Sequence, residues 1–230
     1  KELAYLNKGI QISFLDEKQQ KQYGWQNSWG ISTRSIGLMV MVHSDDKGLV
    51  LPPKVAPLQV VIVPILFDDS REKVLKEAKE ITEKLRKKGI LVQLDDRDGY
   101  TPGWKYNEWE VKGVPLRIEV GPKDIEKKQA MVARRDTGEK KPIPLVQLEK
   151  EIPLLLERIQ QEMYVKAEKL LKESIVTVSN LNDAETQVEK NKKILFVPWC
   201  ETEKCEENLK EKVGAKSLNS PLKQPGLKKG

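Results

Sequence analysis

Cysteine, histidine and long apolar runs are scarce in this chain, and each scarcity excludes a class of protein. Of the 230 residues, two are cysteine and one is histidine. Two cysteines are too few for the disulfide framework of a small secreted domain, and they fit a reducing compartment. No apolar run approaches the ~20 residues that a membrane-crossing helix needs, and no signal-peptide pattern opens the chain. We therefore expect a cytoplasmic protein without a membrane partner.

His43 is the single histidine, and a histidine near a loop can suggest a general base. No matched nucleophile accompanies it, so we interpret it as a structural loop residue. The neighbouring Asp45 and Asp46 suggest a metal pair at first sight, but a turn before Gly48 explains them more simply.

Charge, in contrast, is abundant. Charged residues make up 33% of the chain and the formal net charge is +6. That balance favours a polyanionic partner, although a mixed lysine and glutamate surface is equally usual for any soluble protein. The apolar share of 38% suffices for a core, and 230 residues can hold one large or two small domains.

One cation interrupts an apolar stretch. The run ISTRSIGLMVMV, residues 31–42, is too short to span a membrane and is bounded by Gly and Pro, which predicts a buried strand. Arg34 inside such a strand is costly unless it is paired or meets an anion. Gly30 and Gly37 bracket it, and glycine in a strand often marks the close approach of a ligand. A phosphate-bearing ligand would explain all three residues, but a structural arginine bonded to a carboxylate explains Arg34 equally well.

From residue 58 onward, strand and helix patterns alternate. LQVVIVPIL, residues 58–66, is typical of a strand that is covered on both faces. Residues 69–88 predict a helix, with Asp69 as its N-cap and Gly89 at its end. ILVQL, VPLRIEV and QAMVARRD predict further strands, and residues 102–112 a short helix. This alternation implies an α/β fold with a parallel or mixed sheet.

Other elements flank this region. Residues 12–24 predict a strand, a turn and a strand, and the prolines at 52, 53 and 57 predict a linker between domains. Residues 142–174 predict a long helix that is broken or kinked at Pro153. KKILFVPW, residues 192–199, predicts a buried strand. The long helix carries an apolar stripe, expected to pack on the sheet, that comprises Ile152, Leu156, Ile159, Met163, Ala167 and Leu170.

Two long stretches resemble a known family. NSWGISTRSIGLMVMVHSDDKGLVLPPKVAPLQVVIVPI, residues 27–65, resembles motif 3 of class II aminoacyl-tRNA synthetases continuing into their anticodon-binding domain. The match is to prolyl-tRNA synthetases of the eukaryotic and archaeal-like type, and it extends through residues 95–124 to the C-terminal region.

The resemblance implies α/β (α+β) architecture in three parts. Residues 1–55 would be the C-terminal part of the catalytic domain, with its antiparallel sheet. Residues 56–150 would be an α/β anticodon-binding domain with a mixed sheet. Residues 151–230 would be a small, incomplete α+β domain that resembles a zinc-binding domain.

The resemblance also implies a nucleotide site. Gln11, Ser32 and Arg34 would contact ATP, with Arg34 holding the phosphates or stacking on adenine, and Trp29 and Gly30 would line the proline pocket. In the family a stretch with Thr-Ser-His follows this glutamine, whereas here Gln11 runs directly into residue 12. Either residues are absent there or the pocket is incomplete. Motifs 1 and 2 are not in this chain, so we expect a fragment that does not catalyse alone.

The segment DDRDGYTPGWKYNEWEVK, residues 95–112, is dense in charged and aromatic residues. Carboxylates can accept the N1 and N2 protons of guanine, lysine or arginine can donate to its O6 and N7, and unstacked bases lie on aromatic rings. Proline anticodons carry two adjacent guanines. The candidate readers are Asp96, Arg97, Lys105 and Glu108, with Arg117 and Glu119 behind them. A solvated loop and helix held by salt bridges is the alternative.

Cys200 and Cys205 lie five residues apart in CETEKC. In the family, a pair at this spacing joins a second pair near the C-terminus to bind zinc, but no second pair follows here. The family's C-terminal tyrosine is missing too. Half of a zinc site and two free thiols therefore remain equally open.

The expected function is that of a prolyl-tRNA synthetase. The partners would be ATP, L-proline and tRNA(Pro), with Mg²⁺ on the phosphates, possible structural Zn²⁺, and a homodimer as the assembly. One alternative is a noncatalytic RNA-binding module derived from a class II synthetase. Another is a sister synthetase for a different small amino acid.

Overall fold

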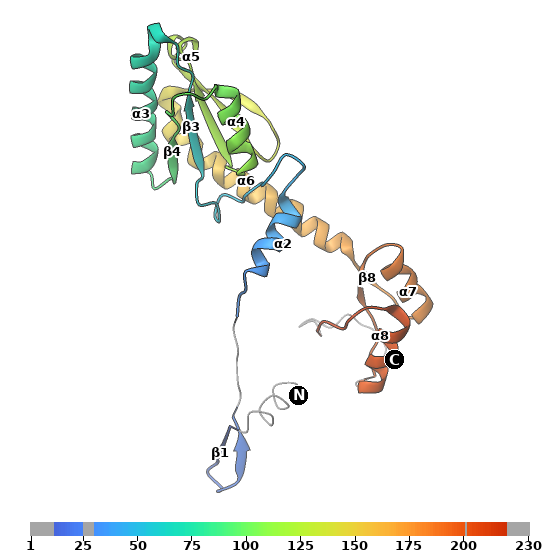
Figure 1. Ribbon diagram of the computed structural model, residues 1–230. Helices are drawn as coiled ribbons and strands as arrows, with labels where there is room; N and C mark the ends of the chain where they lie inside the picture. Colours follow the sequence, from blue (N-terminus) through green and yellow to red (C-terminus); the bar gives the residue numbers. More distant parts are fainter. Residues whose placement is uncertain (1–11, 25–29, 201, 220–230) are drawn as a thin grey trace. The chain divides into compact units, whose positions relative to one another are not determined.

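The computed structural model describes residues 12–24, 30–200 and 202–219 (Figure 1). The chain divides into two compact units, residues 1–39 and residues 40–230. None of the helices in these described ranges combines the length and apolar character that a membrane span requires.

The first unit holds a β-hairpin. Strands β1 (Ser13–Leu15) and β2 (Lys21–Tyr23) pair antiparallel. The carboxylate of Asp16 accepts the backbone N–H groups of Lys18 and Gln20, which closes the turn between the strands. The predicted strand, turn and strand are therefore confirmed.

The predicted buried strand around Arg34 is wrong. Residues Arg34–His43 form the helix α2, and no residue of α2 is buried. A strand needs a partner for its backbone groups, and no strand pairs with this segment in the described part of the chain, whereas a helix bonds its own backbone. Arg34 is exposed at the start of α2, and His43 ends the helix and does not lie in a loop.

The second unit is built on a five-stranded mixed sheet with the order β4-β3-β5-β6-β7. The parallel strands are β4 (Val92–Leu94), β3 (Val60–Pro64) and β5 (Leu116–Val120). Strands β6 (Gln129–Arg134) and β7 (Lys140–Pro144) continue the sheet antiparallel. This arrangement confirms the predicted mixed sheet.

Helices cover the two faces of this sheet unequally (Figure 1). The helices α3 (Arg71–Lys87) and α6 (Leu145–Ser174) pack on one face, where they enclose the main apolar core with Val60, Ile62 and Ile118. On the other face, α4 (Pro102–Val111) is the one helix of the described residues that packs there, through Trp109 on Val61. The short helix α5 (Pro122–Glu126) links β5 to β6.

Several predicted helix ends need correction. Asp69 is not the N-cap of α3, because it lies in a short 3-10 helix, Asp68–Ser70, and Ser70 takes the cap position. Residues 142–144 were predicted to begin the long helix, but they form the last part of β7, and α6 begins at Leu145. Proline is tolerated in β7 because this strand lies at the edge of the sheet. Gly89, with φ +77°, does end α3 as predicted.

The helix α6 continues through Pro153, so the predicted break there is wrong, whereas the alternative of a kink stays a prediction. Four residues of the predicted stripe, from Ile152 to Met163, are buried. Ala167 is only half-buried and Leu170 is 52% exposed, so the stripe packs on the sheet only along the first half of α6. The sheet is shorter than the helix, which leaves the later turns without an apolar partner there.

A small α/β element follows α6. It comprises β8 (Ile175–Thr177), α7 (Leu181–Glu189), β9 (Ile194–Phe196) and α8 (Glu203–Val213), and its two strands pair parallel. Val178, Ala184 and Val213 form its core. β9 is only partly buried, because a two-stranded sheet has little to cover it, so the predicted buried strand is corrected here as well.

The segment 44–51 lies against the end of α4. The backbone N–H of Leu49 donates to the carbonyl of Val111 at 3.0 Å, and that of Leu51 donates to the carbonyl of Gly113 at 3.3 Å. A Cβ added to Gly48, whose φ is +136°, would lie 2.6 Å from Val111 Cα. Only glycine permits this approach. The segment 44–51 is thus part of the second compact unit, which begins at Val40. Pro52 and Pro53, in the predicted linker, are buried.

Candidate nucleic-acid interface

Asp95 lies at the centre of a polar cluster on the α4 face of the sheet. It follows β4 directly, and its backbone N–H donates to the carbonyl of Ile62 at 2.8 Å, so it continues the parallel pairing. Strand alternation then turns its side chain toward α4. The residue is 1% exposed, so its carboxylate is stable there only with partners.

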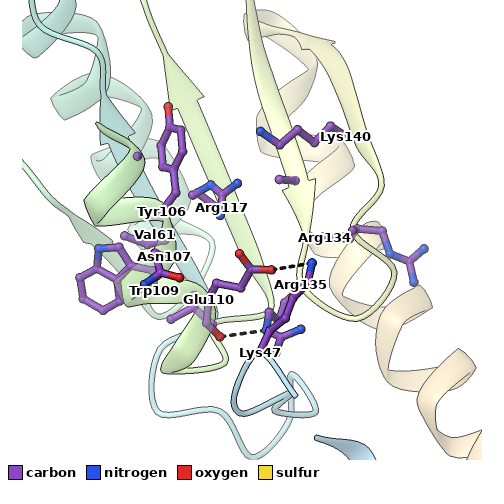
Figure 2. Close-up of a pocket in the computed structure, with 14 residues that line it drawn as sticks. Lys47, Val61, Tyr106, Asn107, Trp109, Glu110, Arg117, Arg134, Arg135 and Lys140 are labelled. Atoms are coloured by element: carbon purple, nitrogen blue, oxygen red, sulfur yellow. Dashed lines mark hydrogen bonds and ion pairs between the residues drawn. The ribbon is translucent and has the colours of Figure 1, made fainter. Parts of the chain in front are cut away.

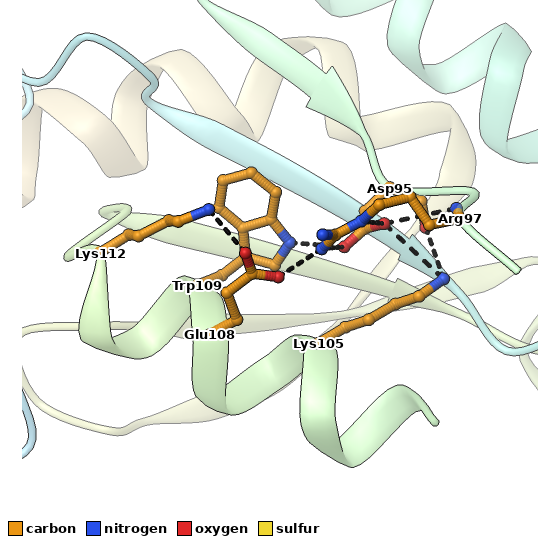
Figure 3. Close-up of polar contacts among 6 residues, drawn as sticks. All are labelled: Asp95, Arg97, Lys105, Glu108, Trp109 and Lys112. Carbon is orange, nitrogen blue, oxygen red and sulfur yellow. Dashed lines mark hydrogen bonds and ion pairs between the residues drawn. The ribbon is translucent and has the colours of Figure 1, made fainter. Parts of the chain in front are cut away.

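Those partners come from the following loop and from α4 (Figure 3). Arg97 donates from Nε to Oδ1 and from Nη2 to Oδ2 of Asp95, both at 2.8 Å. Trp109 Nε1 donates to Oδ2 at 2.7 Å, and Lys105 Nζ donates to the Asp95 carbonyl at 3.1 Å. Arg97 also pairs with Glu108. The cluster thus satisfies a buried carboxylate with two cations and an indole.

The electrostatics of the cluster follow from these contacts. Burial by itself would raise the pKa of Asp95, but hydrogen bonds from Arg97 and Trp109 outweigh it and hold that pKa at about 2. Hydrogen bonds from Arg97 and Lys112 lower the pKa of Glu108. The cluster is therefore ionised at neutral pH and holds Arg97 in one orientation.

The structure brings together three of the four predicted base readers. The side chains of Arg97 and Glu108 are 41% and 20% exposed, so both can meet a ligand. Lys105 is 3% exposed, which places it beneath the surface as a support for Asp95. Asp96 is exposed beside them and makes no ion pair within the described residues. The central residue, Asp95, was missed, although its position directly after an apolar strand was a usable signal.

Two aromatic rings next to Arg97 were also missed. Tyr100 and Trp104 stack with their centroids 4.1 Å apart and an interplanar angle of 23°. The Arg97 guanidinium lies 5.2 Å from the Tyr100 centroid and 5.5 Å from that of Trp104. Both rings are nearly half exposed. Their spacing, four residues apart across the start of a helix, was visible in the sequence.

A second polar region lies between α4 and the strands β5 to β7, in an open cavity of about 360 Å³ (Figure 2). Arg117 Nε donates to Glu119 Oε1 at 3.0 Å, and Lys140 Nζ donates to the same oxygen at 2.9 Å. The Arg117 guanidinium lies 4.3 Å from the Tyr106 ring centroid. Burial and the negative charge of Glu119 raise the pKa of Tyr106. Arg117 therefore lines this cavity, and Glu119 pairs with two of the cations that line it, Arg117 and Lys140.

The segment 44–51 closes one end of this cavity. Arg135 makes two hydrogen bonds to Asp45, at 2.8 and 2.6 Å, and its Nε donates to the Glu110 carbonyl at 2.8 Å. The bonds from Arg135 lower the pKa of Asp45 to about 2. Asp45 is thus part of a turn, as predicted, and it also anchors that turn to the sheet. The sequence contained no signal for this pairing, because 90 residues separate its partners.

The predicted nucleotide residues lie in the first unit. Gly30, Ser32 and Arg34 are exposed, and Arg34 makes no ion pair with any residue that the structure describes. The Ser32 carbonyl accepts the hydroxyl of Ser35 at 2.7 Å. Gln11 and Trp29 lie outside the described residues. Because Arg34 is exposed, its charge needs no buried partner, and its nucleotide role depends on the family resemblance.

The two thiols lie near one another around the start of α8. Cys200 Sγ is 3.0 Å from the hydroxyl oxygen of Thr202, and bonds to Thr202 and Cys205 lower the pKa of Cys200. Among residues 12–24, 30–200 and 202–219, no three or more His, Cys, Asp or Glu side chains gather where they could hold a metal ion. A structural zinc ion takes four ligands, so these two thiols do not make a zinc site by themselves.

Comparison with known families matches the sheet region and the C-terminal region separately. Residues 59–154 match the family described as "Anticodon binding domain". Residues 181–230 match the family described as "Prolyl-tRNA synthetase, C-terminal". A proline–tRNA ligase of Natranaerobius thermophilus is 45% identical over 90% of this chain, and the cytoplasmic enzyme of Arabidopsis thaliana is 44% identical over 97%.

This chain is similar to the C-terminal portion of prolyl-tRNA synthetases.

Solved structures show the same similarity. A prolyl-tRNA synthetase of Cryptosporidium parvum complexed with L-proline and AMP aligns with a TM-score of 0.83 and 48% identity, over 92% of this chain. The same enzyme with halofuginone and AMPPNP aligns with a TM-score of 0.82. The chain covers 43% of each of the two curated relatives and 43% of the solved chain. It therefore spans less than half the length of these prolyl-tRNA synthetases.

Proposed function

We propose that this chain supplies the tRNA-reading part, and one edge of the nucleotide site, of an enzyme that activates proline with ATP and transfers it to tRNA(Pro). The curated relatives are named proline–tRNA ligases, and the aligned enzyme was solved with proline and AMP. We place the enzyme in the cytoplasm as a homodimer, with domain boundaries near residues 55 and 150.

The observation that carries this function is the Arg97–Glu108 pair on the surface of the matched anticodon-binding region. Arg97 is oriented by a buried carboxylate, and both side chains reach solvent. A guanidinium and a carboxylate side by side complement guanine, because its O6 and N7 accept protons while its N1 and N2 donate them. Two neighbouring guanines of a proline anticodon would meet such a pair.

The candidate readers would then have different roles. Arg97, Glu108 and the exposed Asp96 would contact base edges, because their side chains are accessible. Lys105 would act as a positioning residue that holds Asp95, and through it Arg97. Arg117, paired with Glu119 beside the cavity, would contact the RNA next to the two guanines.

In the first unit, Ser32 and Arg34 would contact ATP, together with Gln11. Arg34 begins α2 and is exposed, so a nucleotide phosphate can reach its guanidinium. Trp29 and Gly30 would line the proline pocket. Mg²⁺, when bound, would spread the charge of the phosphates. Cys200 and Cys205 would supply two of the four ligands of a structural zinc site, and the alternative is that they are free thiols.

Guanine discrimination tests the anticodon assignment. The 230-residue chain is titrated with RNA stem-loops that carry the two guanines or two adenines in the anticodon. Glu108→Gln should reduce the preference for guanine about tenfold, because one good bidentate contact discriminates by roughly 1–3 kcal/mol. Glu168→Gln, an exposed pair partner of Lys172 on α6, is the control. If Glu108→Gln prefers guanine over adenine as strongly as the unmodified chain does, the assignment of Glu108 as a base reader is wrong.

Proline-dependent ATP–pyrophosphate exchange tests the catalytic part. The assay uses the longer protein that contains this chain, since relatives are more than twice as long. Exchange with proline, and its loss in Arg34→Ala, is expected for a synthetase. A protein that binds RNA but exchanges nothing would instead be a noncatalytic module.

A further inference from the structure

The connector between α2 and the sheet, residues 44–56, packs on the sheet in a way that a simple linker would not need. A segment that only joins two parts of a chain is usually exposed and makes few contacts. Here Val50 is 5% exposed and Ala56 is 4% exposed, and Pro52 and Pro53 are buried as well. Val50 belongs to the same apolar core as β3 and β5. The connector therefore follows one fixed path.

Two glycines and a helix side chain hold the backbone of the connector on this path. A Cβ added to Gly113 would lie 2.6 Å from the carbonyl oxygen of Leu49, which matches the approach of Gly48 to α4. Both glycines have a positive φ, +73° and +136°, so no other residue fits at either position without strain. Farther along, the Lys54 backbone N–H donates to Gln160 Oε1 of α6 at 3.0 Å.

One buried cation anchors the beginning of the connector. The side chain of Arg135, directly after β6, is 4% exposed, and its Nη1 and Nη2 donate to the two carboxylate oxygens of Asp45. Its Nε donates to the carbonyl of Glu110 in α4. Lys47 pairs with the carboxylate of Glu110 at the same end of the cavity (Figure 2). A bidentate pair between a guanidinium and a carboxylate fixes direction as well as distance.

The helix α2 runs directly into this anchored turn. The Ser44 backbone N–H donates to the carbonyl of Val40 at 2.9 Å, which adds one more helical bond. Asp45 and Gly48 then exchange two backbone hydrogen bonds, at 3.2 and 3.1 Å, which close the turn. The last turn of α2 is therefore tied to the sheet without an intervening free residue. The same helix begins at Arg34, the residue that would contact ATP.

We infer that Asp45 and Arg135 are positioning residues for the transfer to tRNA. By fixing the direction in which α2 leaves the sheet, they would allow one tRNA to meet the RNA-reading face and the nucleotide residues together. This inference rests on the proposed function and adds a role for two residues that act through α2. Loss of the pair should leave proline activation and RNA binding intact and damage only their combination, because reaction rates depend steeply on the geometry of the reactants.

Kinetics of the longer protein that contains this chain test the pair. Asp45→Asn removes the charge that Arg135 binds and keeps the size of the side chain. Asp46→Asn is the control, because Asp46 is exposed and has no ion pair in the part of the chain that the structure describes. The kcat for charging tRNA(Pro) should fall about tenfold in Asp45→Asn, since a small misplacement far from the reacting atoms can cost this much or more. It should be unchanged in Asp46→Asn.

Two partial reactions separate positioning from a purely structural role. In Asp45→Asn, proline-dependent ATP–pyrophosphate exchange and the Kd of the guanine-containing stem-loop should both stay within about twofold, because neither set of contacts is changed. Urea unfolding of each variant gives the fraction of folded protein, and the rates are compared per folded molecule. A pair that served stability alone would lower exchange and charging together.

A double substitution shows whether the two side chains act through each other. Arg135→Gln should lower the kcat for charging as Asp45→Asn does, and the double variant should cost no more than either single one, since all three lack the same bond. Arg135→Lys keeps the charge but not the forked geometry, so its kcat should lie between those of Arg135→Gln and the unmodified protein.

The inference is overturned if folded Asp45→Asn charges tRNA(Pro) at the normal rate, if it loses exchange to the same extent as charging, or if the two single losses add up in the double variant. Failure of the proposed function has a different result. If the unmodified protein performs neither exchange nor charging, both hypotheses are wrong. If it performs both reactions and Asp45→Asn does so equally well, only the positioning role is wrong.

Discussion

The two faces of the five-stranded sheet differ in chemistry although the same strands form both. In β5, Leu116, Ile118 and Val120 turn to the face that α3 and α6 cover, and all three are fully buried. Arg117 and Glu119 of the same strand turn to the face that carries α4 and the cavity. One face is an apolar core, and the other is a set of paired charges around an aromatic centre.

This difference separates a closed, apolar face of the sheet from a partly open, charged one. Two long helices exclude water from the first face, so its side chains need only be apolar and well packed. A single ten-residue helix leaves part of the second face open, where charges can reach a ligand. The open face also contributes to folding, however, because the side chain of Asp95 is as inaccessible to solvent as those of the apolar core.

Asp95→Asn should produce the largest loss. It removes the charge that balances the buried Lys105 and that orients Arg97, and breaking a buried pair costs about 3–5 kcal/mol. Urea unfolding measures the change in the free energy of unfolding. Asp96→Asn, at an exposed neighbour, should stay within about 0.5 kcal/mol. If Asp95→Asn also changes the free energy of unfolding by no more than about 0.5 kcal/mol, the cluster on the open face has no part in stability.

Ile118→Ala should destabilise the covered face by about 3 kcal/mol, because it leaves a cavity at a fully buried site. Val146→Ala is the control, since Val146 is 90% exposed. RNA affinity of the folded Ile118→Ala protein should be unchanged, as its side chain lies on the face away from Arg97. Weaker RNA binding by Ile118→Ala under conditions where it is fully folded would contradict the separation of the two faces.

Acid should lower the free energy of unfolding through the carboxylates of the open face, because the apolar side chains of the covered face do not titrate. The pKa of Asp95 is about 2 in the folded protein and has a usual value of 3.8, so its ionised form favours folding. This contribution is complete above about pH 4 and is lost as the pH falls through about 2; it amounts to about 2 kcal/mol. Asp45, with a pKa also of about 2, acts in the same direction.

The free energy of unfolding should therefore be compared between the unmodified chain and Asp95→Asn from pH 7 to pH 2. The difference should shrink below pH 4. A difference that stays constant over this range would show that Asp95 does not titrate as its contacts imply.

The periodic elements were predictable because local spacing determines them. The buried face of α3 and the short helix α4 follow from residues a few positions apart, and so does the all-apolar β3. The edge strand β7 escaped prediction because its two prolines and two lysines do not resemble a strand. They are tolerated there because only one side of β7 is paired.

Arg34 shows the limit of the same reasoning. A run of apolar residues around a cation fits a buried strand or an exposed helix, and periodicity in a short run does not separate the two. Without a partner strand in the described residues, the segment forms α2. At the candidate site, the sequence identified the charged segment 95–112 as a whole. It did not predict which residues of that segment are buried supports and which are exposed.

The sequence by itself determined which family this chain resembles, where its main helices and strands lie, and which segment is dense in charged and aromatic residues. Only the tertiary structure decided that Lys105 is buried, that Asp95 orients Arg97, and that Asp45 anchors a turn to Arg135. The physical reason is distance along the chain. Helix and strand patterns depend on neighbours a few residues away, whereas burial and ion pairing depend on which distant segments the folded sheet brings into contact.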